Sequence, residues 1–304
     1  MQDGKTSFTA RLVSWARGVP MVTAWGPAVG ARDGRRRTPD PLAVDLIGGG
    51  LAASLHAFDR TPGLAWAARF GSAGLVDHLH LRTAALDRVV ADSVAAGVRQ
   101  IVLLGAGFDA RAWRLDGLQG ATVIEVDHPA TQAAKRRQLE ARAPHAAQVV
   151  YAPVDFSKDS LADALATAGH DAAAPTLWLW EGVTMYLPAA ATQATVTTLR
   201  ARSAAGSRLA VTYVTPRLLP LHATAAAATR RLFASIGEPL LGAVTATDMR
   251  SRLAQQGFAV EEDGCNVDWA RAHGGSARLA HLFRCERLAV ASAVPARGDQ
   301  EPVP

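Results

Sequence analysis

Cysteine is scarce in this chain of 304 residues, which contains only Cys265 and Cys285. The two have neither the short spacing of metal ligands nor the number that a disulfide framework needs, so we interpret both as ordinary buried thiols. The sequence therefore predicts no metal site and no structural disulfide. This composition is typical of a reducing compartment, and we expect a cytoplasmic protein.

Long apolar runs are lacking as well. No stretch approaches the roughly 18 to 20 apolar residues that cross a bilayer, and the first residues, MQDGKTSFTARLVSW, contain no apolar signal core. We therefore expect no transmembrane segment, no secretory leader and no membrane partner. Hydrophobic residues still make up 49% of the chain and charged residues 19%, which excludes a disordered protein and favours a globular one.

Charge is not clustered either. The formal net charge of +5 comes mostly from arginines spread along the chain, whereas a nucleic-acid-binding protein more often gathers basic residues together with aromatics. The basic run at 35–37 is interpreted as a solvated segment. We therefore predict no nucleic-acid partner.

What the sequence does contain is a regular alternation of apolar strands with helical segments. This alternation predicts an α/β fold with a mostly parallel sheet and helices on both faces. The predicted strands are residues 101–104, 122–126, 148–154, 176–180, 208–214, 258–262 and a last candidate at 280–291. The predicted helices are 8–17, a stretch starting near 42, 81–94, 130–142, 161–168, 188–204, 217–236 and 247–256.

Three regions flank or interrupt this alternation. Residues 1–80 have no strand pattern and predict a helical lead-in that covers a core running from 81 to 294. An alanine-rich helical insertion at about 217–246 is placed to cover the strand ends. The tail, 295–304, has the composition of a disordered segment.

The strongest local signal is the glycine turn in IVLLGAGFDARAWRL, residues 101–115. A buried strand runs into Gly105 and Gly107 and then into a helix-compatible segment, as at the start of a nucleotide-type site. Glycines allow the sharp turn and the close approach of a ligand to the backbone, and a helix N-terminus offers free N–H groups. An ordinary strand-to-helix turn without a ligand is the alternative.

The spacing after this turn narrows the choice of ligand. Asp127 follows Gly107 by twenty positions, the interval at which a doubly wound fold places the carboxylate that binds ribose hydroxyls. Ala110 and Arg111 stand where the last glycine of a dinucleotide fingerprint is expected. The missing glycine favours S-adenosylmethionine (SAM), which has a ribose and no phosphate, over NAD.

Acidic residues end three consecutive predicted strands, namely Asp127, Asp155 and Glu181. Ligands of open parallel sheets sit at the carboxyl ends of the strands, and carboxylates there suit a ribose diol, an adenine amino group and an ammonium. Asp127 and Asp155 are alternatively helix N-caps. Glu181 follows a tryptophan-rich apolar strand, where a carboxylate without a partner is costly.

At these positions the sequence resembles the leucine carboxyl methyltransferase type of class I SAM-dependent methyltransferases, including bacterial small-molecule O-methyltransferase relatives. The matching blocks, in order, are LLGAGFDARAWRL, VIEVDHPATQAAKRR, VDFSKD and LWEGVTMYLP, and the preceding LRTAALD resembles the family's segment with a SAM-binding arginine. The resemblance covers about 81–216 and is less clear in the first 70 residues and in 217–267. It implies a Rossmann-like, mostly parallel seven-stranded sheet with a helical cover.

The resemblance also implies a role for each matched residue. Arg82 would pair with the SAM carboxylate, and Glu181 would lie near the SAM ammonium. Gly105, with Gly107 beside it, would let the backbone approach the methionine part. Asp127 would hold the ribose hydroxyls.

Three further positions complete the implied site. Asp155 and Phe156 would frame the adenine, with Phe156 replacing the leucine more usual in the family, and Tyr186 would line the mouth. SAM is therefore the expected cofactor and a small-molecule acceptor the expected partner. The sequence predicts no oligomeric state.

The acceptor is the least specified part of this hypothesis. A carboxylate, in secondary metabolism, is the first expectation, and it needs no general base because it is ionised near pH 7. C-methylation or phenol O-methylation of an aromatic or indole compound is the nearest alternative and needs help with proton removal. Candidates for positioning the acceptor are Tyr186, Tyr213 and His222, and His80 and His128 are further candidates for a base.

Aromatic residues offer one acceptor pocket, made of Trp66, Phe70, Trp180 and Tyr213, although Trp180 is equally interpreted as core. A methyltransferase for protein C-termini is less favoured because no peptide-docking module is evident. From other classes, an NAD-dependent oxidoreductase and a non-catalytic SAM-fold binding protein remain as alternatives.

Overall fold

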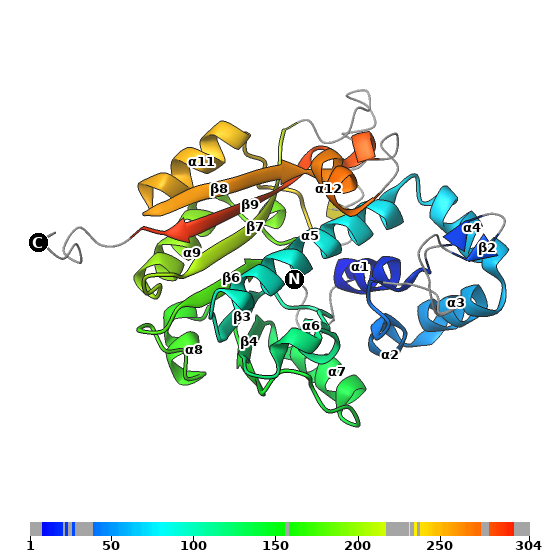
Figure 1. The fold of residues 1–304 in the computed structure, drawn as a ribbon, viewed down its shortest axis with the longest axis horizontal. Coiled ribbons are helices and arrows are strands. Elements are labelled where there is room, and N and C mark those ends of the chain that lie inside the picture. The colour runs from blue at the N-terminus through cyan, green and yellow to red at the C-terminus, as the bar shows by residue number, and fades with distance from the viewer. Residues whose placement is uncertain are drawn as a thin grey trace, which may run out of the picture.

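The computed structural model of this chain is an α/β structure in which one large sheet lies between two layers of helices (Figure 1). It describes residues 8–20, 22–23, 26–27, 39–155, 158–216, 231, 234–235, 238–274 and 280–294. The strands are β1 (Val22–Thr23), β2 (Gly26–Pro27), β3 (Gln100–Leu104), β4 (Thr122–Asp127), β5 (Gln148–Pro153), β6 (Thr176–Trp180), β7 (Arg208–Val214), β8 (Phe258–Cys265) and β9 (Glu286–Ala293).

The helices surround this sheet and continue into a separate group at one end. They are α1 (Phe8–Gly18), α2 (Ala43–Ile47), α3 (Gly49–Arg60), α4 (Pro62–Gly71), α5 (Leu75–Ala95), α6 (Arg111–Arg114), α7 (Pro129–Leu139), α8 (Leu161–Thr167), α9 (Ala189–Ala201), α11 (Ala246–Gln255) and α12 (Asn266–His273). Short 3-10 turns are η1 (Asp116–Leu118), η2 (Thr184–Tyr186) and η3 (His281–Phe283). No helix within the described ranges is long and apolar enough to cross a membrane.

The large sheet has seven strands in the order β5-β4-β3-β6-β7-β9-β8. β5 to β7 pair in parallel, and only β9 runs antiparallel to its neighbours β7 and β8. This confirms the predicted Rossmann-like, mostly parallel seven-stranded sheet. The chain moves outward from β3 to β5 and then returns to β6 beside β3, so the switch point at which ligands bind lies between the carboxyl ends of β3 and β6.

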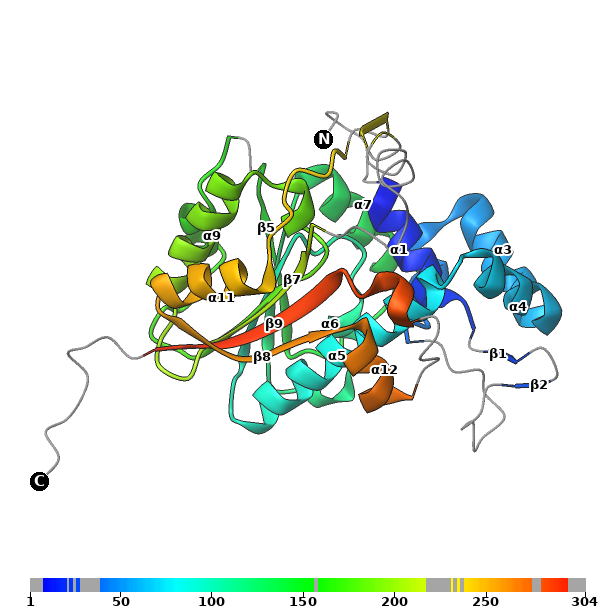
Figure 2. The same cartoon turned by 90° about the horizontal axis from the view of Figure 1, so that it is seen from above.

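Both faces of the sheet are apolar because alternate residues of each strand point to opposite sides. Ile101 and Leu103 of β3 pack with the layer formed by α5, α6, α7 and α12, whereas Val102 and Leu104 pack with α8, α9 and α11. Figure 2 shows α9 and α11 on one side of the sheet and α5 and α12 on the other. Such continuous apolar strands are typical of a sheet covered on both faces.

The helices α1 to α4 form the helical lead-in and have a small core of their own, which includes Leu55, Ala65, Val76 and Leu79. The last two belong to α5, whose 21 residues pass from this core into the main one. The predicted boundary between residues 80 and 81 therefore falls inside a helix. One helix buries apolar residues in both cores, so the lead-in is anchored to the sheet through α5.

Several elements differ from the sequence predictions. The last strand begins at Glu286, not at 280, because η3 occupies 281–283; α12 was not predicted, nor was the two-stranded β1–β2 pair. The predicted helix 217–236 and the tail 295–304 lie wholly or mostly outside the described residues. The described end of the insertion runs beside η2, where the backbone N–H groups of Leu241 and Gly242 donate to Met185 O at 2.8 and 2.9 Å.

Candidate functional site

The glycine turn after β3 is tightly fixed. Gly105 and Gly107 have φ values of +67° and +49°, a region that L side chains rarely adopt. A Cβ on Gly105 would lie 2.5 Å from Cγ2 of Val183, and a Cβ on Gly107 would lie 3.5 Å from Cβ of Ala10 in α1. The turn is therefore packed between Val183, which directly precedes η2, and α1. At position 105 only glycine fits without displacing Val183.

Asp127, at the end of β4, faces this turn. Its Oδ2 accepts a hydrogen bond from Gly107 N at 2.5 Å, and its Oδ1 accepts one from His128 N at 2.6 Å. Burial raises the pKa of Asp127, although the two N–H groups oppose the shift. The N-cap of α7 is His128, whose ring accepts from Ala130 N, so Asp127 does not serve as the cap. Each carboxylate oxygen keeps a second lone pair for a ligand hydroxyl.

Asp155 lies just beyond β5, beside the strand that carries Asp127. Val154 N donates to Asp127 O at 2.9 Å, which ties the two strand ends together. Lys158 Nζ lies 3.1 Å from Asp155 Oδ2. The next helix, α8, has Ser160 as its N-cap, so Asp155 does not cap it. Phe156 lies outside the described residues.

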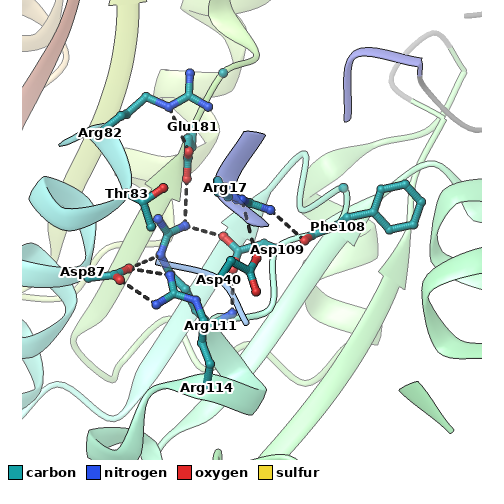
Figure 3. Close-up of polar contacts among 12 residues, drawn as sticks. Arg17, Asp40, Arg82, Thr83, Asp87, Phe108, Asp109, Arg111, Arg114 and Glu181 are labelled. Carbon is teal, nitrogen blue, oxygen red and sulfur yellow. Dashed lines mark hydrogen bonds and ion pairs between the residues drawn. The ribbon is translucent and has the colours of Figure 1, made fainter. Parts of the chain in front are cut away.

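Glu181 follows β6 and is held between two arginines (Figure 3). Arg82 Nε donates to Oε1 at 2.9 Å, and Arg111 Nη1 donates to Oε2 at 2.7 Å. The side chain of Glu181 is 12% exposed. Burial alone would raise the pKa of Glu181, but the guanidinium groups of Arg111 and Arg82 outweigh it and hold the pKa well below its ordinary value. Glu181 is therefore a permanent anion at the switch point.

Arg82 projects from α5 and has two acidic partners. Besides Glu181, its Nη1 donates to Oε1 of Glu286 at 2.8 Å. No described residue accepts a hydrogen bond from Nη2, which lies 3.6 Å from the place where a Cβ of Gly182 would be. Gly182 has a φ of +69°, and its missing side chain leaves that nitrogen uncovered on this side.

Glu286 also belongs to this cluster, although no sequence pattern assigned it to the site. It begins β9, is buried, and its Oε2 lies 2.6 Å from His78 Nε2. The sequence alone gives little indication of this role, because a single acidic residue at the start of an apolar strand is common. Only the antiparallel pairing of β9 with β7 sets Glu286 opposite Val214, at the carboxyl end of the parallel strands.

Arg111 is the second residue that the sequence analysis did not assign. It is 2% exposed, and in addition to Glu181 it donates through Nε to Asp87 Oδ1 at 2.7 Å and through its backbone N to Asp109 Oδ1 at 2.7 Å. Arg114 donates to both oxygens of Asp87 at 2.6 and 2.8 Å (Figure 3). The helix α6 thus supplies cations that hold the acids of α5 and of the glycine turn.

The three residues suggested for positioning the acceptor have different surroundings. Tyr186 lies in η2, packs beside Met185 and is hydrogen-bonded to Thr9 of α1, and burial foremost raises its pKa. Tyr213 faces the layer of α8, α9 and α11, and its hydroxyl donates to Asp263 at 2.9 Å. The structure therefore brings Tyr186, and not Tyr213, to the side of α1. His222 lies outside the described residues.

The other candidates are also separated. His80 is buried with Nε2 3.0 Å from Ala16 O, and burial lowers its pKa to about 4. Trp66 and Phe70 stack on each other on α4 and are exposed, whereas Trp180 is buried in the core. The suggested aromatic pocket is thus not one cluster. Within the described part of the chain, no group of three or more His, Cys, Asp or Glu is arranged to hold a metal ion.

The chain is similar in sequence to known proteins. The sequence profile of the family described as leucine carboxyl methyltransferase matches residues 21–200. Proteins of Streptomyces coelicolor and Frankia alni, both named "Putative S-adenosyl-L-methionine-dependent methyltransferase", are 38% and 45% identical over 217 and 133 residues, or 68% and 43% of this chain. The match spans 66% and 46% of those relatives.

A solved structure supports the fold. The chain is similar to the crystal structure of a DUF574 family protein from Streptomyces avermitilis, with a TM-score of 0.57, 18% sequence identity, and coverage of 96% of this chain and 99% of that one. At this identity the likeness concerns the fold alone.

Proposed function

The chain belongs to the leucine carboxyl methyltransferase family, and from this premise we propose that it transfers a methyl group from SAM to a small-molecule acceptor. The observation that carries the proposal is the row of groups along one edge of the sheet. Gly105, Asp127, Asp155 and Glu181 follow the neighbouring strands β3, β4, β5 and β6, and Arg82 reaches the same edge from α5.

These groups match the polar groups of SAM, and they have donors or lone pairs left for hydrogen bonds to a ligand. Nη2 of Arg82 would donate to the SAM carboxylate, and Glu181, which has unused lone pairs after accepting two N–H groups, would accept from the ammonium. The oxygens of Asp127 would accept from the ribose hydroxyls, and Asp155 with Phe156 would frame the adenine.

When bound, SAM supplies a methyl group that its sulfonium already activates, so the residues of this chain have to align an acceptor and exclude water. α1 is placed for the second task, because Ala10 lies against the glycine turn and Arg17 Nη2 donates to Phe108 O at 2.8 Å. Thr9 of the same helix is hydrogen-bonded to Tyr186. We assign Tyr186 to the wall of the acceptor site.

A carboxylate of a small metabolite is the acceptor that these surroundings support best. It needs no base, whereas His80 is a buried and weak base with a pKa of about 4, its Nε2 faces Ala16 O, and His128 caps α7. The raised pKa of Tyr186 keeps its phenol protonated, so that it can donate a hydrogen bond to an acceptor oxygen. Methylation of a phenol or an indole carbon would need a base.

Calorimetry with SAM, S-adenosylhomocysteine and NAD(H) tests the cofactor. We expect binding of the first two, weakened about a hundredfold or more by Asp127→Ala, because two hydroxyls lose a charged acceptor. Asp116→Ala is the matched control, since that side chain is 90% exposed and lies in η1, before the start of β4, whereas Asp127 lies at the carboxyl end of β4. Tight NAD(H) binding with no response to SAM would refute the proposal.

The acceptor is tested by mass spectrometry for the gain of one methyl group across a panel of carboxylic acids, phenols and indoles. Methyl esters are the expected products. A methylated phenol or indole with no ester would replace the carboxylate by the alternative acceptor. SAM binding without turnover on any acceptor would favour a binding protein.

A further inference from the structure

Glu286 lies outside residues 21–200, which the family profile matches. It nevertheless accepts a hydrogen bond from Arg82, the residue proposed to bind the SAM carboxylate. We propose that Glu286, fixed from behind by His78, is the positioning residue that holds Arg82 for the carboxylate of SAM. This inference rests on the proposed function and adds to it a pair of residues from α5 and β9.

Arg82 and the ammonium of a bound ligand would compete for Glu181. Arg82 uses Nε for Glu181 and Nη1 for Glu286, at 2.9 and 2.8 Å, which fixes the plane of its guanidinium and leaves Nη2 for a ligand. An incoming ammonium would share the oxygens of Glu181 with Arg82. Glu286 is then the anchor of Arg82 that the ligand does not contact.

Glu286 is itself held in one orientation. His78 Nε2 lies 2.6 Å from Oε2 of Glu286, and His78 Nδ1 lies 3.2 Å from Oδ1 of Asn266. The amide of Asn266 is oriented by Nδ2, which donates to Ala280 O at 3.1 Å, so both ring nitrogens of His78 face acceptors. The ring also stacks on Phe283 with centroids 4.7 Å apart.

The result is a row in which basic side chains alternate with acids, each within hydrogen-bond distance of the next: His78, Glu286, Arg82, Glu181 and Arg111. Removing the charge of Glu286 would leave Arg82 with one buried carboxylate partner, Glu181, in place of two. Arg82 would then be free to turn toward Glu181 alone, which closes the space that the ammonium needs.

The test compares two ligands that differ only at the relevant end. S-adenosylhomocysteine carries the amino-acid group, whereas 5′-methylthioadenosine has the same nucleoside thioether without it. For Glu286→Gln we expect calorimetry to show an affinity for S-adenosylhomocysteine reduced by about tenfold or more, and an unchanged affinity for 5′-methylthioadenosine. Glu262→Gln is the matched control, because that glutamate pairs with Arg88 on the surface and is half exposed.

Equal weakening of both ligands, or of neither, would overturn the positioning role. Retained binding of 5′-methylthioadenosine shows that the variant is folded. His78→Gln keeps the carboxylate and removes the ring behind it, so it should weaken S-adenosylhomocysteine in the same direction and spare the shorter ligand. If the unaltered protein binds neither ligand, the proposed function itself fails, and that result is distinct from a failure of this inference.

Discussion

The charge of Glu286 also contributes to the free energy of unfolding, which can be measured without a ligand. Burial alone would raise the pKa of Glu286, but Arg82 and His78 outweigh burial and lower the pKa from 4.5 to about 2. An acid with a depressed pKa in the folded state stabilises the protein above its unfolded pKa and loses that contribution as the pH falls toward the folded pKa. The contribution is therefore about 3 kcal/mol above pH 5 and about 1 kcal/mol at pH 3.

The assay is urea unfolding of the unaltered protein and of Glu286→Gln between pH 7 and pH 3. Other acids titrate in both proteins, so the difference in unfolding free energy between the two isolates Glu286. We expect that difference to shrink by about 2 kcal/mol over this range. Glu262→Gln, the control in a half-exposed pair, should show little change. A difference that stays constant or grows as the pH falls would refute the assignment of Glu286 as a buried, charged partner.

Three further substitutions test the frame of the site. Lys135→Met should destabilise by about 3 kcal/mol or more in urea unfolding, because it leaves the buried carboxylate of Glu125, 2.7 Å away, unpaired, and adding Glu125→Leu should restore most of the loss. Gly105→Ala should lower the unfolding temperature, and Val183→Ala should recover only the part due to the overlap with the new methyl group, not the backbone strain at φ +67°. Tyr213→Phe should cost about 1 kcal/mol of stability and leave SAM affinity unchanged, since its hydroxyl bonds to Asp263 of β8 and its ring packs in the layer of α8, α9 and α11; a loss of SAM binding would contradict that placement.

The charged side chains of the proposed site form ion pairs with one another in the structure. Glu181 and Arg82 neutralise each other across 2.9 Å, which lowers the cost of burying either one. A zwitterionic ligand end could add its carboxylate to Arg82 and its ammonium to Glu181 without leaving a buried charge unpaired. The same arrangement would disfavour ligands that bring only one of the two charges.

Most of the proposed cofactor site could be predicted from the sequence, because its residues lie at the ends of strands in a parallel sheet. Gly105, Asp127, Asp155 and Glu181 each come directly after an apolar run, and parallel strands necessarily bring their carboxyl ends to one edge. Arg82 was added by resemblance alone. Its distance from Glu181, 99 positions along the chain, could not be bridged by any local pattern.

Tertiary structure decided which side chains meet at that edge. The antiparallel return of β9 brings Glu286 to Arg82 across 204 positions, and Asn266 of the unpredicted α12 fixes His78 across 188. Alternation within β7 allows Tyr213 either face of the sheet, and only the packing of the helices puts it in the layer of α8, α9 and α11. Local patterns thus determined where the strands and turns are, while the partners of each buried charge depended on long-range pairing, because an ion pair forms wherever the fold brings opposite charges together.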